Sequence, residues 1–305
     1  MKHFLIRRLL HNIIVLIGVM AIVFFVVYLI GDPVALMLPP EATLQDREIL
    51  REALRLDDPL VVQFFHFVGQ ALKGDLGTSF RHGVPALPLA LSRLPATLEL
   101  TIIAVFFSSI VGIPIGVYSA IKRNTFVDHF ARIFALFGQS MPVYWSGIMM
   151  ILLFSVNLNW LPPSGRGELV NLIMPGLTLG FFTTAPLMRL MRSSMLEVLN
   201  KDYVRTARAK GLTNKIVIFK HALRNAAIPA ITVFGMQIGV MLGGAVLTET
   251  IFSWPGMGRF VVQAIYNRDF PTIRASVIVF AVLIIIVNFL TDLSYVFLNP
   301  QIRYD

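Results

Sequence analysis

The chain contains no cysteine among its 305 residues. Disulfide bridges, thiolate metal sites and a cysteine nucleophile are therefore excluded from its structure and chemistry. Charged residues are scarce as well, since they make up only 14% of the sequence, while hydrophobic residues make up 56% and the mean hydropathy is +0.74. A chain of this composition cannot hide its apolar surface from water by folding alone, so the lipid bilayer is its expected surroundings.

Motifs for catalysis and for cofactors are also missing. The G-x-x-x-x-G-K-[ST] loop that cradles nucleotide phosphates does not occur, and the six histidines stand singly, without the spacing of a metal site. Ser119 and Lys122 match the S-x-x-K pattern of acylating enzymes, but its companion motifs are absent, and we interpret the match as the inner end of a span. We expect no catalytic residue, no metal and no cofactor on this chain, which argues against an intramembrane enzyme.

Long apolar runs are what the sequence does contain. A bilayer core about 30 Å thick needs about 20 apolar residues per helix. The first run, within residues 1–30, has no cleavage site after it and is interpreted as a retained helix, not as a signal peptide. The predicted fold is an all-α polytopic membrane protein with six transmembrane helices at about 9–30, 97–121, 133–158, 171–191, 226–247 and 273–298.

The distribution of positive charge predicts how these helices are oriented. Short loops rich in Lys and Arg resist translocation and stay in the cytoplasm. If the N-terminus is inside, every lysine except Lys73 falls on the inner side, while most acids, such as Asp57 and Asp58, fall outside. We therefore expect both termini in the cytoplasm. The net charge of +9 is then not a sign of nucleic-acid binding.

Residues 31–96 are predicted to form a helical insertion on the outer, periplasmic side. One helix should start at Thr43, whose hydroxyl can cap the first turn. A second should start after Pro59, because apolar residues follow it at helical spacing: Val61, Phe64, Phe65, Val68 and Leu72. We interpret this insertion mainly as a structural cover, which lies on the membrane surface or against the ends of the spans.

The inner segment 193–225, between the fourth and fifth spans, is longer than a simple connection requires. It contains a predicted short basic helix that is capped by Asp202 and stopped by Gly211, a residue suited to the left-handed position after a helix. Between these two lie Tyr203, Arg205, Thr206, Ala207, Arg208, Ala209 and Lys210. An amphipathic run follows and leads back to the membrane, with one apolar face made by Ile216, Phe219 and Leu223.

Some residues inside the spans are candidates for a path across the membrane or for helix packing. The fifth span has a strip of small residues, Gly235, Gly239 and Gly243, which lets another helix approach closely, either within the chain or from a second subunit. Gln237 in that span is a candidate for the path. On the sixth span, Asn288 and Asp292 lie four residues apart and are interpreted as packing or anchoring groups, with a gate as the alternative. Other close-packing or hinge points are predicted at Gly112, Gly116, Gly176 and Gly180.

Residues 249–272 are predicted to form an outer loop that folds back over this path. The loop is rich in turn formers and aromatic residues, including Trp254. The sequence leaves open whether Arg259, Arg268 and Asp269 contact another protein or only close a turn by local ion pairs.

Motifs spread over the whole chain resemble one family. The stretch Asp202–Gly211, followed by His221–Ala226 and Pro229, is similar to the coupling loop of ABC-transporter permeases for dipeptides, oligopeptides, glutathione and nickel. Further similar stretches are Gly31–Pro33, Gly74–Ser79, Arg93–Leu100, Trp254–Arg259, Arg268–Pro271 and Asn299–Tyr304. The Glu-Ala-Ala of the general importer loop is replaced here by Arg205, Thr206 and Ala207, so the docking role carries over without the glutamate's contact.

The resemblance implies a fold like that of a type I ABC importer permease, with the coupling loop seated in a cleft of a nucleotide-binding subunit. The implied partners are a second homologous permease subunit, two ATP-binding subunits that hold ATP and magnesium, and an extracytoplasmic solute-binding protein. Di- or oligopeptides are the expected cargo, and glutathione or a nickel complex is the alternative. An ion-coupled secondary transporter is a weaker alternative, because neither buried ionisable residues at midplane nor inverted repeats are evident.

Overall fold

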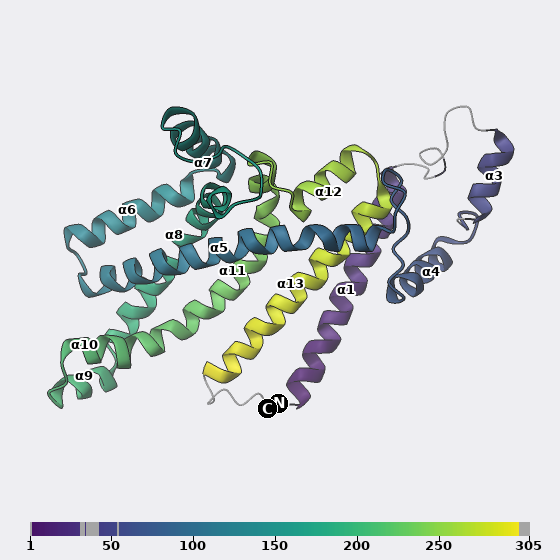
Figure 1. The fold of residues 1–305 in the computed structure, drawn as a ribbon. Coiled ribbons are helices and arrows are strands. Elements are labelled where there is room, and N and C mark those ends of the chain that lie inside the picture. The colour runs from purple at the N-terminus through teal and green to yellow at the C-terminus, as the bar shows by residue number, and fades with distance from the viewer. Residues whose placement is uncertain (1, 31–33, 35–42, 54, 299–305) are drawn as a thin grey trace. The chain divides into compact units, whose positions relative to one another are not determined.

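The computed structural model describes residues 2–30, 34, 43–53 and 55–298. Within these ranges the chain is helical almost throughout, and the one extended pairing is an isolated antiparallel bridge between Thr78 and Pro85. The chain divides into two compact units (Figure 1): unit 1 comprises Met1–Pro95 and Gly256–Ile285, and unit 2 comprises Ala96–Pro255 and Ile286–Asp305. The motifs Gly31–Pro33 and Asn299–Tyr304 lie outside the described residues.

Unit 1 is built around the first long helix, α1 (Lys2–Ile30), with α3 (Leu44–Ala53), α4 (Leu60–Leu72) and α12 (Met257–Tyr266). It also holds the beginnings of α5 (Ala86–Ile121) and α13 (Phe270–Leu298). As predicted, α3 begins directly after Thr43 and α4 directly after Pro59. The core is apolar, and within it Phe24 of α1 stacks on Phe67 of α4 with ring centroids 5.9 Å apart.

Unit 2 is centred on α8 (Ile173–Leu199), which packs against α6 (Phe126–Ser140), α7 (Val143–Met150) and α11 (Leu223–Ile251). The short helices η1 (Ile151–Asn157) and η2 (Leu169–Leu172) lie between α7 and α8. The long inner connection contains α9 (Asp202–Ala209), α10 (Asn214–Ile216) and η3 (Val217–Ala222). Figure 1 shows α9 and α10 at the ends of α8 and α11.

The predicted close packing at glycines is confirmed where α5 crosses α8. A Cβ atom added to Gly116 of α5 would lie 2.5 Å from the backbone oxygen of Met188, and one added to Gly180 of α8 would lie 2.9 Å from the oxygen of Ala104. Any larger side chain would therefore push the two helices apart, as expected for small-residue contacts between membrane helices.

Five helices in the described part of the chain are long and apolar enough to cross a bilayer: Ile6–Val26, Ala86–Ile121, Leu169–Leu199, Val233–Ile251 and Phe270–Leu293. The predicted third span at 133–158 is not one straight helix, because α6 and the segment Val143–Asn157 are bent by 100° relative to each other. The break falls at Met141, which is extended (φ −83°, ψ 126°) in front of Pro142. A residue before proline is pushed out of the helical region, and this explains the bend.

The prediction of an outer loop at 249–272 is wrong in one respect, since it contains a helix. α11 continues to Ile251, and α12 then occupies ten of the following residues. Met257, Phe260 and Ala264 are buried at helical spacing, so burial of this face stabilises a helix that the neighbouring turn formers conceal in the sequence.

Candidate functional site

The basic helix in the inner connection forms as α9, from Asp202 to Ala209. Its cap differs from the prediction, because Lys201 takes the extended N-cap conformation (φ −74°, ψ 150°) and no side chain caps the helix. Asp202 lies in the first turn, where its negative charge favours the positive end of the helix dipole, and its carboxylate is 3.5 Å from the guanidinium of Arg205. Asp202 thus acts as a first-turn acid and not as a cap.

The end of α9 agrees with the prediction for Gly211. This glycine has φ +76°, and its amide donates to the backbone oxygen of Arg208 at 3.0 Å. No atom lies within 4 Å of the place where a Cβ would be added. Substitution there would strain the backbone without a steric clash, since residues with a Cβ rarely adopt this left-handed conformation.

A small apolar cluster fixes α9 to the helices on either side of it. Val204 is completely buried and Ala207 is 6% exposed, and both pack with Val217 of η3 and with Val198 and Leu199 at the end of α8. Because this cluster joins α9 to two neighbours at once, movement of α9 carries the end of α8 and the start of η3 with it.

The other residues predicted for this site share one exposed surface. Only Ala207 of the predicted set is buried, while these eight are exposed: Asp202, Tyr203, Arg205, Thr206, Arg208, Ala209, Lys210 and Gly211. The surface of α9 therefore presents an aromatic ring and several cations to solvent, which suits an acidic partner surface.

The return to the membrane passes through a wide helical turn. η3 is a π-helix, so its backbone hydrogen bonds join residues five apart. As a result Val217 and Ala222, which are five residues apart, are both buried, whereas Ile216 and Phe219 of the predicted apolar face are exposed. The sequence pattern did not reveal this change of helical register.

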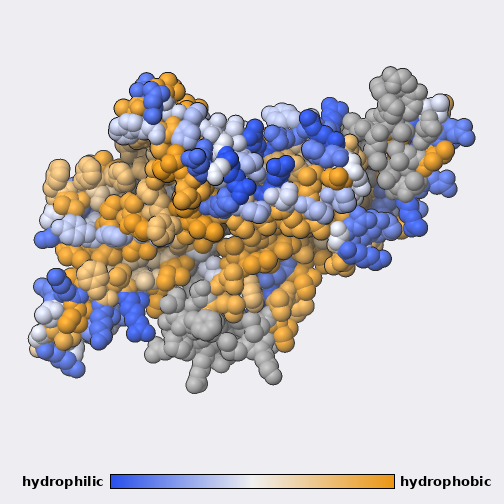
Figure 2. Space-filling model, viewed as in Figure 1, coloured by the Kyte–Doolittle hydropathy of each residue, from blue (hydrophilic) through white to orange (hydrophobic). Residues whose placement is uncertain are grey.

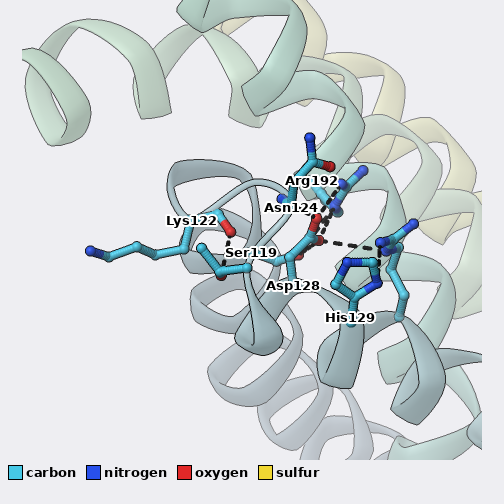
Figure 3. A network of polar contacts seen from close by, with 8 residues as sticks. Ser119, Lys122, Asn124, Asp128, His129 and Arg192 are labelled. Atoms are coloured by element: carbon cyan, nitrogen blue, oxygen red, sulfur yellow. Dashed lines mark hydrogen bonds and ion pairs between the residues drawn. The ribbon is translucent and has the colours of Figure 1, made fainter.

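A buried ion pair lies where α8 approaches this connection, and the sequence did not predict it (Figure 3). Asp128 at the start of α6 is fully buried and accepts hydrogen bonds from Arg192 of α8, at 2.7 Å from Nε and 2.8 Å from Nη2. The hydroxyl of Ser119 near the end of α5 donates to the same carboxylate at 2.6 Å, and the amide of Asn124 donates at 3.0 Å. The cluster ties the ends of α5, α6 and α8 together.

This cluster changes the interpretation of the S-x-x-K match. Ser119 serves the carboxylate of Asp128, and Lys122 contributes only its backbone oxygen, to the hydroxyl of Thr125. Figure 3 shows the Lys122 side chain pointing away from Asp128. Nothing in the sequence pairs Arg192 with an acid 64 residues away.

The glycine strip of α11 divides into two parts. A Cβ added to Gly235 would overlap the side chain of Thr291 on α13, so this end of the strip is a seam within the chain. Gly243 has no atom within 4 Å of such a Cβ and is exposed, which leaves that end available to another helix. Between these ends, Gln237 and Gly239 are partly exposed.

On α13, Asn288 and Asp292 are both partly buried. They share a helix with Thr291, whose side chain packs on Gly235. A packing, anchoring or gating role for Asn288 and Asp292 stays a prediction.

Several motifs near the predicted outer ends of the spans are paired in space. In unit 1, Asp269 is buried and accepts hydrogen bonds from the hydroxyls of Ser79 (2.5 Å) and Thr272 (2.8 Å) and from the amide of Phe80 (3.1 Å). Asp269 therefore holds a turn together through hydroxyl and amide donors, not through local ion pairs. Arg268 beside it is exposed and has a positive φ of 53°.

A second pairing, in unit 2, joins α5 to the end of α11. The hydroxyl of Thr97 donates to Glu249 at 2.6 Å, and the indole of Trp254 donates to the backbone oxygen of Ala96 at 2.8 Å. Trp254 and Glu249 are both buried. The stretches Arg93–Leu100 and Trp254–Arg259, which are separate motifs in the sequence, thus contribute to one contact.

Close to this contact, the guanidinium of Arg166 forms a two-pronged ion pair with Glu99, at 2.5 Å and 3.0 Å. The carboxylate raises the pKa of Arg166 above its usual value, because the hydrogen bond favours the charged form. Among the described residues, no group of three or more His, Asp or Glu side chains is arranged to hold a metal ion.

Comparisons with known proteins agree with this architecture. Residues 112–304 match the family described as binding-protein-dependent transport system inner membrane component, and residues 1–101 match the N-terminal part described for the same transport-system membrane components. The dipeptide transport system permease protein DppB of Escherichia coli K12 is 42% identical over 338 aligned positions, covering 100% of this chain and 99% of the relative. The glutathione transport system permease protein GsiC of E. coli O6:H1 is 41% identical over 305, covering all of both chains.

The fold is also found among solved structures. A chain of the MetNI methionine ABC transporter in an inward-facing conformation superposes with a TM-score of 0.56 and 20% identity, covering 69% of this chain and 96% of that one. At this identity the likeness shows the fold alone. The family match over residues 112–304 and the full-length relatives show more: the chain belongs to the family of binding-protein-dependent transport system inner membrane components.

Proposed function

We propose that this chain is one of two permease subunits of an ATP-driven importer that carries di- or oligopeptides across the bacterial inner membrane. The relatives that support this cargo are named for dipeptide and for glutathione transport. Glutathione is itself a tripeptide, so both names describe small peptides. Glutathione and a nickel complex remain the alternative cargoes for the same machinery.

The proposed orientation follows from charge. Both termini lie in the cytoplasm, because the lysines gather in the inner connections and residues 31–96 are then periplasmic. The inner connection that contains α9 faces the cytoplasm in this arrangement, and the turn held by Asp269 faces the periplasm.

The exposed and cationic surface of α9 is the observation on which the proposal mainly rests. Val204 and Ala207 hold this helix to α8 and η3, while Tyr203, Arg205 and Arg208 stay exposed. A rigid projecting helix of this kind suits a cleft on a separate ATP-binding subunit, which supplies ATP and magnesium. Two such subunits are proposed, one for each permease subunit.

The link from α9 to the spans runs through α8. Closure of the ATP-binding subunits moves α9, and the cluster of Val204 and Ala207 passes this movement to the end of α8. The ion pair between Arg192 and Asp128 then carries α5 and α6 along with α8. This contiguous set of contacts is the mechanical path that the proposal requires.

The remaining proposed partners meet other surfaces. A second permease subunit, similar to this one, packs beside the exposed Gly243 end of the α11 strip and completes the pathway, with Gln237 and Gly239 near it. An extracytoplasmic solute-binding protein delivers the peptide to the periplasmic side. Covalent chemistry on the peptide is not part of this mechanism.

The test replaces Gly211 with valine, which strains the end of α9 without a clash. Gly83→Val is the matched control, because Gly83 also has a positive φ (65°) and open surroundings but lies in the proposed periplasmic segment. Uptake of a radiolabelled dipeptide is measured in cells that lack other peptide importers and express the chain with its partner subunits. We expect Gly211→Val to lower uptake at least tenfold with normal membrane insertion, and Gly83→Val to retain most of it.

Equal uptake by the two variants would contradict the docking role of α9. Unlabelled glutathione is added in the same assay, and strong inhibition of dipeptide uptake would favour glutathione as the cargo. Uptake that persists after ATP depletion and collapses with the proton gradient would favour the ion-coupled alternative.

A further inference from the structure

An open apolar groove lies between three elements of unit 2. Its volume is about 670 Å³, within the range of about 300–1,000 Å³ that is typical of small-ligand sites. α5 contributes Tyr118 and Ile121, α6 contributes Val127 and Phe130, and η3 contributes Phe219. We call this the α5–α6 groove. Figure 2 shows hydrophobic residues over α6 and the adjoining part of α5.

The side chains that line the groove are open to the surroundings. Phe130 is 61% exposed, Phe219 is 62% exposed and Tyr118 is 50% exposed. Exposing apolar surface to water costs about 25 cal/mol per Å², so side chains this exposed need hydrocarbon around them. Elements of the described chain do not provide that cover.

Cations border one end of the groove. Lys122 and Arg123 directly follow Ile121, Lys220 directly follows Phe219, and Arg224 directly follows Leu223, which also lines the groove. Lys122 lies one helical turn beyond Tyr118, so both belong to the same side of the helix end. The wall is thus apolar and its rim is basic.

These cations have no acidic partner within the described residues. None of Lys122, Arg123, Lys220 and Arg224 takes part in an ion pair there, although surface pairs such as Lys201 with Glu197 do form on the neighbouring segment. Asp128 is the one acid in the α5 and α6 segments that border the groove, and its carboxylate is occupied by Arg192. The rim therefore carries an uncompensated positive charge.

We propose that the α5–α6 groove binds an anionic phospholipid of the cytoplasmic leaflet. An acyl chain lies along Tyr118, Phe130 and Phe219, and the phosphate meets the basic rim. Basic pockets between membrane helices on the cytoplasmic side bind such headgroups, and Tyr118 has the position of an interfacial aromatic residue. The leaflet rests on the orientation given under the proposed function, whereas the binding itself does not.

A lipid bound in the α5–α6 groove would affect the arrangement of the helices that border it. Its site is bordered by α5, α6 and η3, and these are elements that the Asp128 cluster and the α9 anchor also join. A bound lipid would fill the space between them and favour the arrangement seen in this structure.

The test uses the full chain purified in mild detergent with the subunits that remain bound to it. Native mass spectrometry counts bound lipid during titration with phosphatidylglycerol or with phosphatidylcholine of the same acyl chains. We expect phosphatidylglycerol to bind about tenfold more tightly than phosphatidylcholine, because each cation near the phosphate favours the anionic headgroup.

Two variants separate the parts of the site. Lys122→Gln with Arg123→Gln removes charge from the rim and should lower the affinity for phosphatidylglycerol about tenfold, with little effect on phosphatidylcholine. Val127→Trp fills the groove and should lower the affinity for both lipids. The control, Lys73→Gln with Arg55→Gln, removes two exposed cations of unit 1 that do not line the groove, and it should bind as the unaltered chain does.

Equal binding of the two lipids, or unchanged binding in both groove variants, would overturn the proposal. A second permease subunit in the groove would overturn it as well. Since the chain has no native cysteine, a single Val127→Cys variant tests this directly, and efficient cross-linking to another subunit would be the contrary result. Lipid counting needs neither ATP nor peptide, so its outcome is independent of the uptake assay.

Discussion

The helices α9 and α12 both connect longer helices, and they differ in how firmly they are held. α9 buries only Val204 and Ala207, whereas α12 buries Met257, Gly258, Phe260 and Ala264. The segment after α12 is fixed further by Asp269 and its three donors. α12 is therefore part of a core, while α9 keeps most of its surface free for a partner. The difference supports the proposal that α9, and not α12, docks on a moving subunit.

The largest loss of stability is expected when Asp269, which anchors the segment after α12, is replaced. In Asp269→Ala, the buried hydroxyl of Ser79 and the amide of Phe80 lose their acceptor. The buried hydroxyl of Thr272 loses the same acceptor. At about 1–3 kcal/mol for each of these three unsatisfied groups, we expect a loss of about 3–9 kcal/mol and little folded protein. Thermal unfolding in detergent is the measurement. Asp75→Ala is the control, because Asp75 is exposed and its carboxylate accepts only from the amide of Gly77. Similar melting temperatures for both variants would show that the turn is not anchored as described.

The next effect is expected at the ion pair that joins α8 to α6. Arg192→Ala removes both hydrogen bonds that the guanidinium donates to the buried carboxylate of Asp128 and leaves only the longer ion pair with Arg132 at 3.8 Å. Breaking a buried pair of this kind costs about 3 kcal/mol or more. Arg189→Ala is the matched control on α8, because Arg189 is exposed. The double variant Arg192→Ala with Asp128→Asn should regain part of the lost stability, since no uncompensated charge remains. A double variant that melts below both single variants would argue against the pair as the source of the effect.

The smallest change in stability is expected for α9 itself. It tests whether the buried side chain of Val204 links α9 to α8. Val204→Ala removes two buried methyl groups and should cost about 1–2 kcal/mol, expressed as faster amide hydrogen exchange over residues 202–210. Transport should fall while ATP hydrolysis persists, because α9 still docks but no longer moves α8 firmly. Tyr203→Ala, at the exposed neighbour, should leave hydrogen exchange unchanged and weaken binding of the ATP-binding subunit instead. If Val204→Ala keeps the ratio of transport to hydrolysis, the cluster is not the link.

Local features of the fold could be predicted from the sequence. α4 begins after Pro59 and Gly211 takes a left-handed conformation, because proline and glycine restrict or free the backbone where they stand. The apolar runs predicted the long helices for a similar reason. A single apolar helix satisfies its own backbone hydrogen bonds in the bilayer, so its own composition is enough to predict it. The helical character of α12 was also encoded, in the spacing of Met257 and Phe260, but turn formers beside it obscured the pattern.

Features that depend on contacts between distant residues could not be predicted from the sequence. Asp128 and Arg192 are 64 residues apart, and neither is unusual in its own segment. The 100° bend before Pro142 required knowledge that neighbouring helices accommodate a broken span. The predicted cap of α9 was wrong for a smaller reason, because the helix begins at Asp202, one residue earlier than it would if Asp202 were the N-cap.

The π-helix η3 makes the length of the inner connection as important as its composition. One residue more per turn places Val217 and Ala222 on the same buried side, and each residue of an α-helix turns the chain by about 100°. Wound as an ordinary α-helix of the same length, the two residues would lie about 140° apart around the axis, and one of them would leave the buried side. A homologous chain with one residue fewer here would keep both residues on one side only by winding this stretch as an α-helix, so the number of residues and the type of helix must change together.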